Sequence, residues 1–119
     1  MLKITKLEPS GIDDRGTVYD FSLRESKYFI VLNRKKGSVS GRHYHKGASK
    51  SKNPEILYLF KGKIKLITKN PDKEIEVDEN SLIEIPVGLY HEVHALTDII
   101  IAEICVDKDD FEKHDTVVK

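Results

Sequence analysis

The sequence lacks an excess of charge of either sign, has no tryptophan and contains a single cysteine. Twenty Lys and Arg residues balance twenty Asp and Glu residues, so the chain has no overall positive field of the kind that attracts nucleic acid or anionic membranes. We therefore expect neither nucleic acid nor a membrane as a partner. The local basic clusters are interpreted as solvated surface; they comprise Arg34, Lys35 and Lys36, and Lys46, Lys50 and Lys52.

Long hydrophobic runs are also absent. No stretch approaches the ~18 consecutive apolar residues of a membrane-spanning helix, and the amino-terminal MLKITKLEPSG lacks the apolar segment of a signal peptide. One cysteine excludes an intramolecular disulfide, and Cys105 lies in the apolar run Ile99–Val106, where we expect it to be buried as a small hydrophobe. These features predict a cytoplasmic protein, and 119 residues fit one domain.

Short runs of β-branched and aromatic residues recur along the chain, separated by Gly, Pro, Asn and Asp. Such runs predict strands. The expected strands are Thr17–Leu23, Tyr28–Leu32, Glu55–Phe60, Lys63–Thr68, Glu74–Val77, Ser81–Ile85, Tyr90–Ala95 and Asp98–Val106.

The connections between these runs leave little room for helices. Lys61-Gly62 and Asn70–Asp72 indicate two hairpin turns. Only Lys108–His114 and the polar segment Gly47–Asn53 are compatible with a helix. The pattern predicts an all-β fold, a sandwich or a small barrel such as a jelly roll, with at most a short terminal helix.

Two histidines flank one tyrosine in the stretch GRHYH. Side chains alternate along a strand, so His43 and His45 project to one face and Tyr44 to the other. Imidazole nitrogens bind Zn, Fe, Ni and Cu, and a carboxylate with a third histidine would complete a mixed set of ligands. Taken alone, the pair is weak evidence for a metal, because histidines are common on the solvated face of a strand.

The remaining histidines supply the candidates for a third ligand, and they are His91, His94 and His114. His94 lies three residues after His91, an odd spacing that places the two on opposite faces of a strand. His114 lies in the polar tail, where we expect no functional role.

The segment GSVSGRHYH, followed after a gap by EILYLFKG, resembles the first signature of the cupin superfamily. That signature has a glycine, five residues, His-x-His, a variable gap, a glutamate, six residues and a second glycine. Its positions match Gly37, His43, His45, Glu55 and Gly62. The gap KGASKSKNP is longer than the three or four residues that cupins more often have there.

The segment NSLIEIPVGLYHEVHA resembles the second cupin signature. Pro86, Gly88 and His91 match it directly. Asn80 stands in place of the first glycine, an exchange that Asn tolerates because it also adopts left-handed turn conformations, and Ala95 replaces the final asparagine.

The resemblance implies a double-stranded β-helix, the jelly-roll barrel of cupins, with residues 1–119 forming a single cupin domain. It also implies that His43, His45, Glu55 and His91 bind one divalent metal, which would be Zn, Fe, Mn or Ni. The alternative is a metal-free polar pocket in which the histidines transfer protons.

Within the cupins, DDRGTVYDF, SGRHYHKG and IPVGLYHEVHALTD resemble isomerases and epimerases of nucleotide-linked keto sugars. The sugar 3,4-ketoisomerases are usually metal-free and tend to carry glutamine where Glu55 stands. The pair HYH with Glu55 is also similar to the zinc-binding cupin domain of capsular polysaccharide assembly enzymes. The implied ligand is a small molecule, a nucleotide sugar, and the alternatives are a non-catalytic binder of a small ligand or metal and an Fe(II)-dependent dioxygenase.

Isomerisation requires a base that removes a proton next to a carbonyl and groups that stabilise the resulting oxyanion. We assign catalysis to His43, His45 and Tyr90. We assign substrate binding to Arg42, Tyr44 and Glu103. Small cupins often pair to cover a sheet edge or an apolar outer face, so we expect a homodimer.

Overall fold

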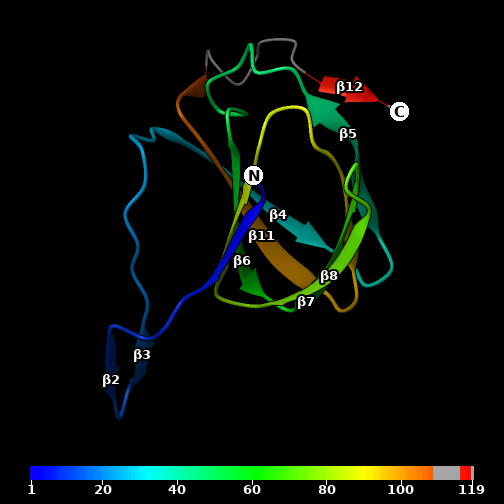
Figure 1. Cartoon of the computed structure of the whole chain (residues 1–119). Coiled ribbons are helices and arrows are strands. Elements are labelled where there is room, and N and C mark those ends of the chain that lie inside the picture. The colour runs from blue at the N-terminus through cyan, green and yellow to red at the C-terminus, as the bar shows by residue number, and fades with distance from the viewer. Residues whose placement is uncertain (109–115, 119) are drawn as a thin grey trace.

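The computed structural model describes residues 1–108 and 116–118, and Figure 1 shows their strands. The strands are β1 (Lys3–Lys6), β2 (Gly11–Asp13), β3 (Gly16–Val18), β4 (Tyr28–Arg34), β5 (Val39–His45), β6 (Glu55–Lys61), β7 (Lys63–Lys69), β8 (Lys73–Asp78), β9 (Ser81–Ile85), β10 (Tyr90–Ala95), β11 (Ile99–Cys105) and β12 (Thr116–Val118). The helix expected at Lys108–His114, and with it His114, falls outside the described residues except for Lys108. Across the described part of the chain, no helix has the length and apolar character to span a membrane.

Two five-stranded antiparallel sheets form the body of the molecule. Their strand orders are β1-β9-β6-β11-β4 and β12-β5-β10-β7-β8. The sheets enclose a barrel in Figure 1, and the small hairpin of β2 and β3 projects away from it. The predicted all-β jelly roll is therefore confirmed.

The main core lies between the two sheets and follows from side-chain alternation. In β7, the sequence KIKLITK buries every second residue, which directs Ile64, Leu66 and Thr68 inward. These side chains meet Leu57 and Leu59 of β6, where Leu59 is fully buried. Each buried aliphatic side chain contributes about 1.5–3 kcal/mol, so the inner faces of the two sheets hold the barrel together.

A second cluster covers the outer face of the first sheet. Ile56, Tyr58, Leu82 and Ile104 are buried there, with Leu7 and Leu23 packed against them. The expected strand Thr17–Leu23 was wrong beyond Val18, because only Gly16–Val18 pairs, as β3 with β2. The apolar residues that follow cover this sheet instead, and the ring of Phe21 lies 5.0 Å from that of Tyr58.

The connection at Gly62 differs from its prediction. A hairpin was expected, but β6 and β7 belong to different sheets, so the chain turns a corner between them. Gly62 has φ +95°, and a Cβ there would lie 2.4 Å from the carbonyl oxygen of Asp98, which only glycine avoids. The turn at Asn70–Asp72 does form a hairpin, since β7 and β8 pair antiparallel.

The segment Gly47–Asn53 was expected to be compatible with a helix, and this was wrong. Its backbone forms two overlapping turns, in which the amide of Lys52 donates to Ser49 O (3.1 Å) and that of Asn53 to Lys50 O (3.4 Å). The Arg24 guanidinium donates to the carbonyl oxygens of Lys50 and Ser51, at 2.9 and 3.0 Å. The segment is therefore an anchored loop beside the barrel.

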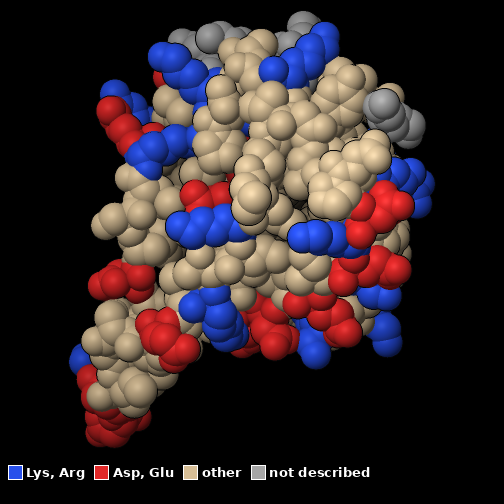
Figure 2. Space-filling model, in the orientation of Figure 1, with Lys and Arg blue, Asp and Glu red and all other residues tan. Residues whose placement is uncertain are grey.

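Charged side chains cover the outside of the molecule. On the face in Figure 2, Lys and Arg are interspersed with Asp and Glu. Arg34, Lys35 and Lys36 are exposed, as expected, and so are Lys46 and Lys50. Lys52 is the exception, because it is buried. Cys105 is buried, as predicted.

Candidate metal centre

The two signature segments meet inside the barrel. His43 and His45 come from β5, and His91 comes from β10 directly opposite His43 in the antiparallel pair. Glu55 begins β6 in the facing sheet. One ligand atom from each of these four residues lies within 4.8 Å of the others, so the structure brings the whole predicted ligand set together.

The Glu55 carboxylate lies among the imidazole rings. Its Oε1 is 3.2 Å from His45 Nε2 and 3.0 Å from His91 Nε2. The His43 ring centroid is 4.6 Å from that of His45 and 4.9 Å from that of His91. His45, Glu55 and His91 are buried, and His43 is partly exposed.

Hydrogen bonds on the far sides of the rings orient them. His91 Nδ1 donates to the carbonyl oxygen of Leu89 at 3.0 Å, because a carbonyl can only accept. His45 Nδ1 shares a hydrogen bond of 3.3 Å with Thr116 Oγ1 from β12. Both rings therefore present Nε2 to the centre, as ligating histidines do when their other nitrogen is fixed by a neighbour.

A β-bulge in β5 sets the register that brings His43 and His91 together. The pairing of β5 with β10 shifts between His91 and Glu92, and Arg42 is the extra residue. Gly41 and Arg42 both have positive φ, +88° and 62°. A Cβ on Gly41 would lie 2.9 Å from His91 O, so the bulge depends on glycine at this position.

The bulge also explains which residues of β5 line the inner cavity. Ser40 and His43 both line the inner cavity although they are three residues apart, because the extra residue changes the alternation. Arg42 is exposed, and its charge acts on Tyr90 and Glu92. It is not brought to the histidines.

Tyr44 and Tyr90 also lie away from the four-residue centre. Alternation along β10 places Tyr90 on the face opposite His91, where its hydroxyl donates to Glu92 Oε2 at 2.6 Å. His94 Nε2 lies 2.8 Å from Glu92 Oε1, so His94 faces away from His91 as expected. Tyr44 and Tyr90 line a separate hollow on this outer face.

A cavity of about 60 Å³ adjoins the centre between the two sheets. His43, Glu55, His91 and Glu103 line it together with apolar side chains such as Leu57. This volume holds a metal ion and a few water molecules. Of the three residues expected to bind substrate, the structure brings only Glu103 to this cavity.

Arg34 lines the same cavity. No sequence pattern indicates that Arg34 lines the cavity, because Arg34 lies in a basic run that is typical of solvated surface. It also contributes, with Lys35 and Lys61, to a neighbouring hollow of about 380 Å³.

The charges at the centre are set by burial and by ion pairs. Burial alone would raise the pKa of Glu55, but hydrogen bonds from His45 and His91 and the charge of Lys52 hold it well below its usual range. Burial and the neighbouring histidines lower the pKa of His43 to about 4. At neutral pH, the centre therefore offers an ionised carboxylate and a neutral His43 ring.

Lys52 is a member of the centre that sequence reasoning missed. Its Nζ lies 2.8 Å from Glu55 Oε2 and 3.6 Å from Glu103 Oε1. Burial alone would lower the pKa of Lys52, but the charges of Glu55 and Glu103 raise it. No local pattern indicates this contact, since the loop that carries Lys52 is placed by distant residues such as Arg24.

The donor set fits a divalent first-row metal. Three imidazole nitrogens and one carboxylate oxygen are typical ligands of Zn and Fe. Because His91 Nδ1 donates to Leu89 O, the Nε2 atom of His91, only 3.0 Å from Glu55 Oε1, carries either a second proton or a lone pair. Two acceptors at this distance require a proton or a metal ion between them. When each ligand atom lies about 2.1 Å from an ion, neighbouring ligand atoms have separations similar to those between Glu55 Oε1 and the Nε2 atoms of His45 and His91.

No protein-family model matches the sequence. No curated protein matches it either.

Comparison with solved structures shows the fold. A 3,4-ketoisomerase from Helicobacter canadensis has a TM-score of 0.78 and 16% identity, over 99% of this chain and 90% of that one. A mutant of the 3,4-ketoisomerase from Thermoanaerobacterium thermosaccharolyticum, in complex with TDP-4-keto-6-deoxyglucose, has a TM-score of 0.75 and 16% identity, over 99% and 87%. The dTDP-4-dehydrorhamnose 3,5-epimerase from Sulfolobus tokodaii has a TM-score of 0.61 and 23% identity, over 87% and 67%.

These likenesses extend over nearly the whole chain. The protein therefore has the cupin β-barrel fold, in the form seen in sugar 3,4-ketoisomerases and 3,5-epimerases, and the predicted resemblance is confirmed at the level of the fold.

Proposed function

We propose that this protein is a metal-binding cupin that isomerises or epimerises a nucleotide-linked keto sugar. The observation that carries the proposal is the convergence of His43, His45, His91 and Glu55 on a cavity inside the barrel. The fold it shares with ketoisomerases, one of them in complex with TDP-4-keto-6-deoxyglucose, supports the choice of substrate class.

The four ligands would hold one divalent ion, which would be Zn, Fe, Mn or Ni and would polarise the keto oxygen of the substrate. With the histidine rings committed as ligands, Glu103 is the carboxylate of the cavity wall that remains to accept a proton. Burial raises the pKa of Glu103, which makes its carboxylate a stronger base. In a metal-free centre, a histidine would take the role of base.

The cavity limits how the substrate binds. Pockets for drug-sized ligands usually measure about 300–1,000 Å³, whereas this one measures about 60 Å³. We therefore place only the keto end of the sugar inside. The diphosphate would lie outside, against Arg34 and the hollow that Arg34 shares with Lys35 and Lys61.

The small cavity equally favours a second candidate, a protein that binds a metal or a small ligand without converting it. This candidate predicts metal binding and ligand retention without product. An Fe(II)-dependent oxygenase would instead need iron and O₂.

Proton exchange in deuterated buffer distinguishes these candidates. Incubation of the metal-loaded protein with TDP-4-keto-6-deoxyglucose should introduce deuterium at the carbon next to the carbonyl, measured by NMR. Protein with both His45→Ala and Glu55→Ala substitutions is the control. Absence of exchange across a panel of nucleotide-linked 4-keto sugars would favour the binding protein.

We also propose that two chains form a dimer. β4 lies at the edge of the first sheet, paired with β11. Phe29 and Val31 of this strand are each 58% exposed. An exposed apolar edge strand favours pairing with a second copy.

A further inference from the structure

We propose that Lys52 acts as an internal counter-cation of the candidate metal centre, balancing Glu55 when no metal is bound and weakening the binding of a metal. The inference rests on the metal-binding part of the proposed function. It concerns a residue from the loop Lys46–Pro54, which joins His45 of β5 to Glu55 of β6.

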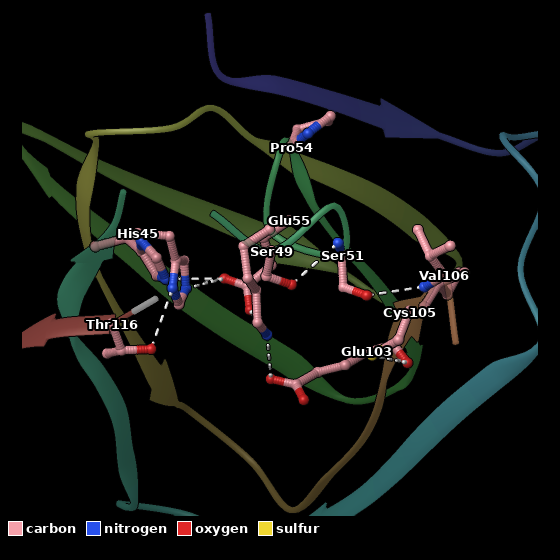
Figure 3. Close-up of polar contacts among 12 residues, drawn as sticks. His45, Ser49, Ser51, Pro54, Glu55, Glu103, Cys105, Val106 and Thr116 are labelled. Carbon is pink, nitrogen blue, oxygen red and sulfur yellow. Dashed lines mark hydrogen bonds and ion pairs between the residues drawn. The ribbon is translucent and has the colours of Figure 1, made fainter. Parts of the chain in front are cut away.

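Contacts with distant parts of the chain fix the position of Lys52. The Arg24 guanidinium donates to the carbonyl oxygens of Lys50, Ser51 and Pro54, at 2.8 to 3.0 Å. The amide of Val106 donates to Ser51 Oγ at 2.8 Å. Figure 3 shows Ser51 and Val106 joined in this way beside Glu55. The backbone on both sides of Lys52 is therefore fixed.

The side chain of Lys52 is enclosed by the two carboxylates that it contacts. It is only 10% exposed, with Nζ at 2.8 Å from Glu55 Oε2 and 3.6 Å from Glu103 Oε1. A buried ammonium group is stable only with such partners, and a buried carboxylate needs a cation in the same way. Glu55 thus has a cation beside it without any metal.

The two oxygens of Glu55 have different partners. Oε1 faces His45 and His91, and Oε2 faces Lys52. A metal ion bound to Oε1 and the ammonium group of Lys52 would lie on either side of one carboxylate. Two cations this close repel each other strongly in a site shielded from water. The lysine should therefore lower the metal affinity and stabilise the metal-free fold.

The test replaces Lys52 by methionine, which is similar in length and uncharged. Zinc affinity is measured by competition with a chromophoric chelator, and thermal unfolding is followed with zinc and with EDTA. We expect K52M to bind zinc at least tenfold more tightly than the wild type and to melt at a lower temperature in EDTA. Lys52→Arg, which keeps the charge, should retain the wild-type affinity.

Lys50→Met is the matched control, because Lys50 is an exposed lysine of the same loop and its bond to Arg24 uses the backbone. It should change neither readout. If K52M does not fold, Lys52→Gln replaces it, since the amide removes the charge but can still donate to Glu55, and it should also bind zinc more tightly.

The outcomes separate this inference from the proposed function. Zinc affinity in K52M equal to or weaker than that of the wild type overturns the role of Lys52 and leaves the metal site intact. Zinc binding by K52M but not by the wild type supports the role of Lys52 and overturns metal binding by the natural protein. Failure of both proteins to bind zinc overturns both ideas.

Discussion

At the scale of single residues, chemistry depends on which side chains the cavity brings together. Glu103 interrupts the apolar strand β11, and its side chain lines the cavity beside His43 and Glu55. An acid in such a strand is costly unless it has a partner, and Lys52 Nζ lies 3.6 Å away. The Glu103 carboxylate therefore lies where it can accept a proton from a substrate in the cavity.

Glu103→Gln should therefore lower the rate of deuterium exchange by about 10²–10⁴-fold, the usual contribution of a general base. The amide has nearly the same shape but cannot accept the proton. Metal content, measured in the same preparation, should stay near that of the wild type because Glu55 and the histidines are unchanged. Normal exchange by this variant would show that another group is the base.

Arg34 is the residue that we expect to bind the nucleotide. Arg34→Gln should weaken the binding of TDP about 10–100-fold, because a hydrogen bond between charged groups contributes about 1.5–3 kcal/mol. Isothermal titration calorimetry measures the affinity. Lys36→Gln is the control, since Lys36 belongs to the same exposed basic run. Equal effects of the two substitutions would indicate that the basic run acts only through its overall charge.

At the scale of elements, the bulge in β5 connects backbone geometry to the candidate metal centre. Gly41→Ala places a Cβ 2.9 Å from His91 O at a φ of +88°. We expect a loss of stability of about 1–3 kcal/mol from the strained backbone, together with a weaker metal affinity because the opposed His43 and His91 must separate.

Gly37→Ala separates these two effects. Gly37 has almost the same φ, +89°, but a Cβ there meets nothing within 4 Å. It should therefore lose stability and keep its metal affinity. Urea unfolding and zinc competition provide the two readouts, and a loss of affinity as large as that of the Gly41 variant would contradict a specific role for the bulge.

Much of the site follows from local rules, which is why it was predictable. Alternation along a strand suffices to place His43 and His45 on one face, and the resemblance to cupins added Glu55 and His91. Asn80 adopts a positive φ of 62°, as expected of a residue in the place of a glycine. These features depend on short stretches of sequence.

Other features depend on contacts between distant residues and could not be predicted in this way. Lys52 reaches Glu55 only because Arg24 and Val106 fix its loop. Phe21 was expected in a strand, but its ring packs on Tyr58 of the first sheet. Alternation also cannot reveal the bulge that brings Ser40 to the same cavity as His43.

At the scale of the whole molecule, the apolar residues Phe29 and Val31 on the edge strand β4 predict a dimer. Light scattering coupled to size-exclusion chromatography should give about twice the chain mass of 13.6 kDa. The double substitution of Phe29 and Val31 by Lys should shift the protein to the monomer, because charges on an edge strand oppose pairing. A monomeric wild type at micromolar concentration would contradict the dimer.

The fold positions four candidate metal ligands from both sheets around one point, and the central prediction is that they bind a metal ion. Elemental analysis of protein purified with Zn, Fe, Mn and Ni supplied tests it most directly. We expect close to one first-row metal ion per chain in the wild type, and a large loss of metal in both His45→Ala and Glu55→Ala. Wild-type protein that remains folded and metal-free under these conditions would contradict the claim.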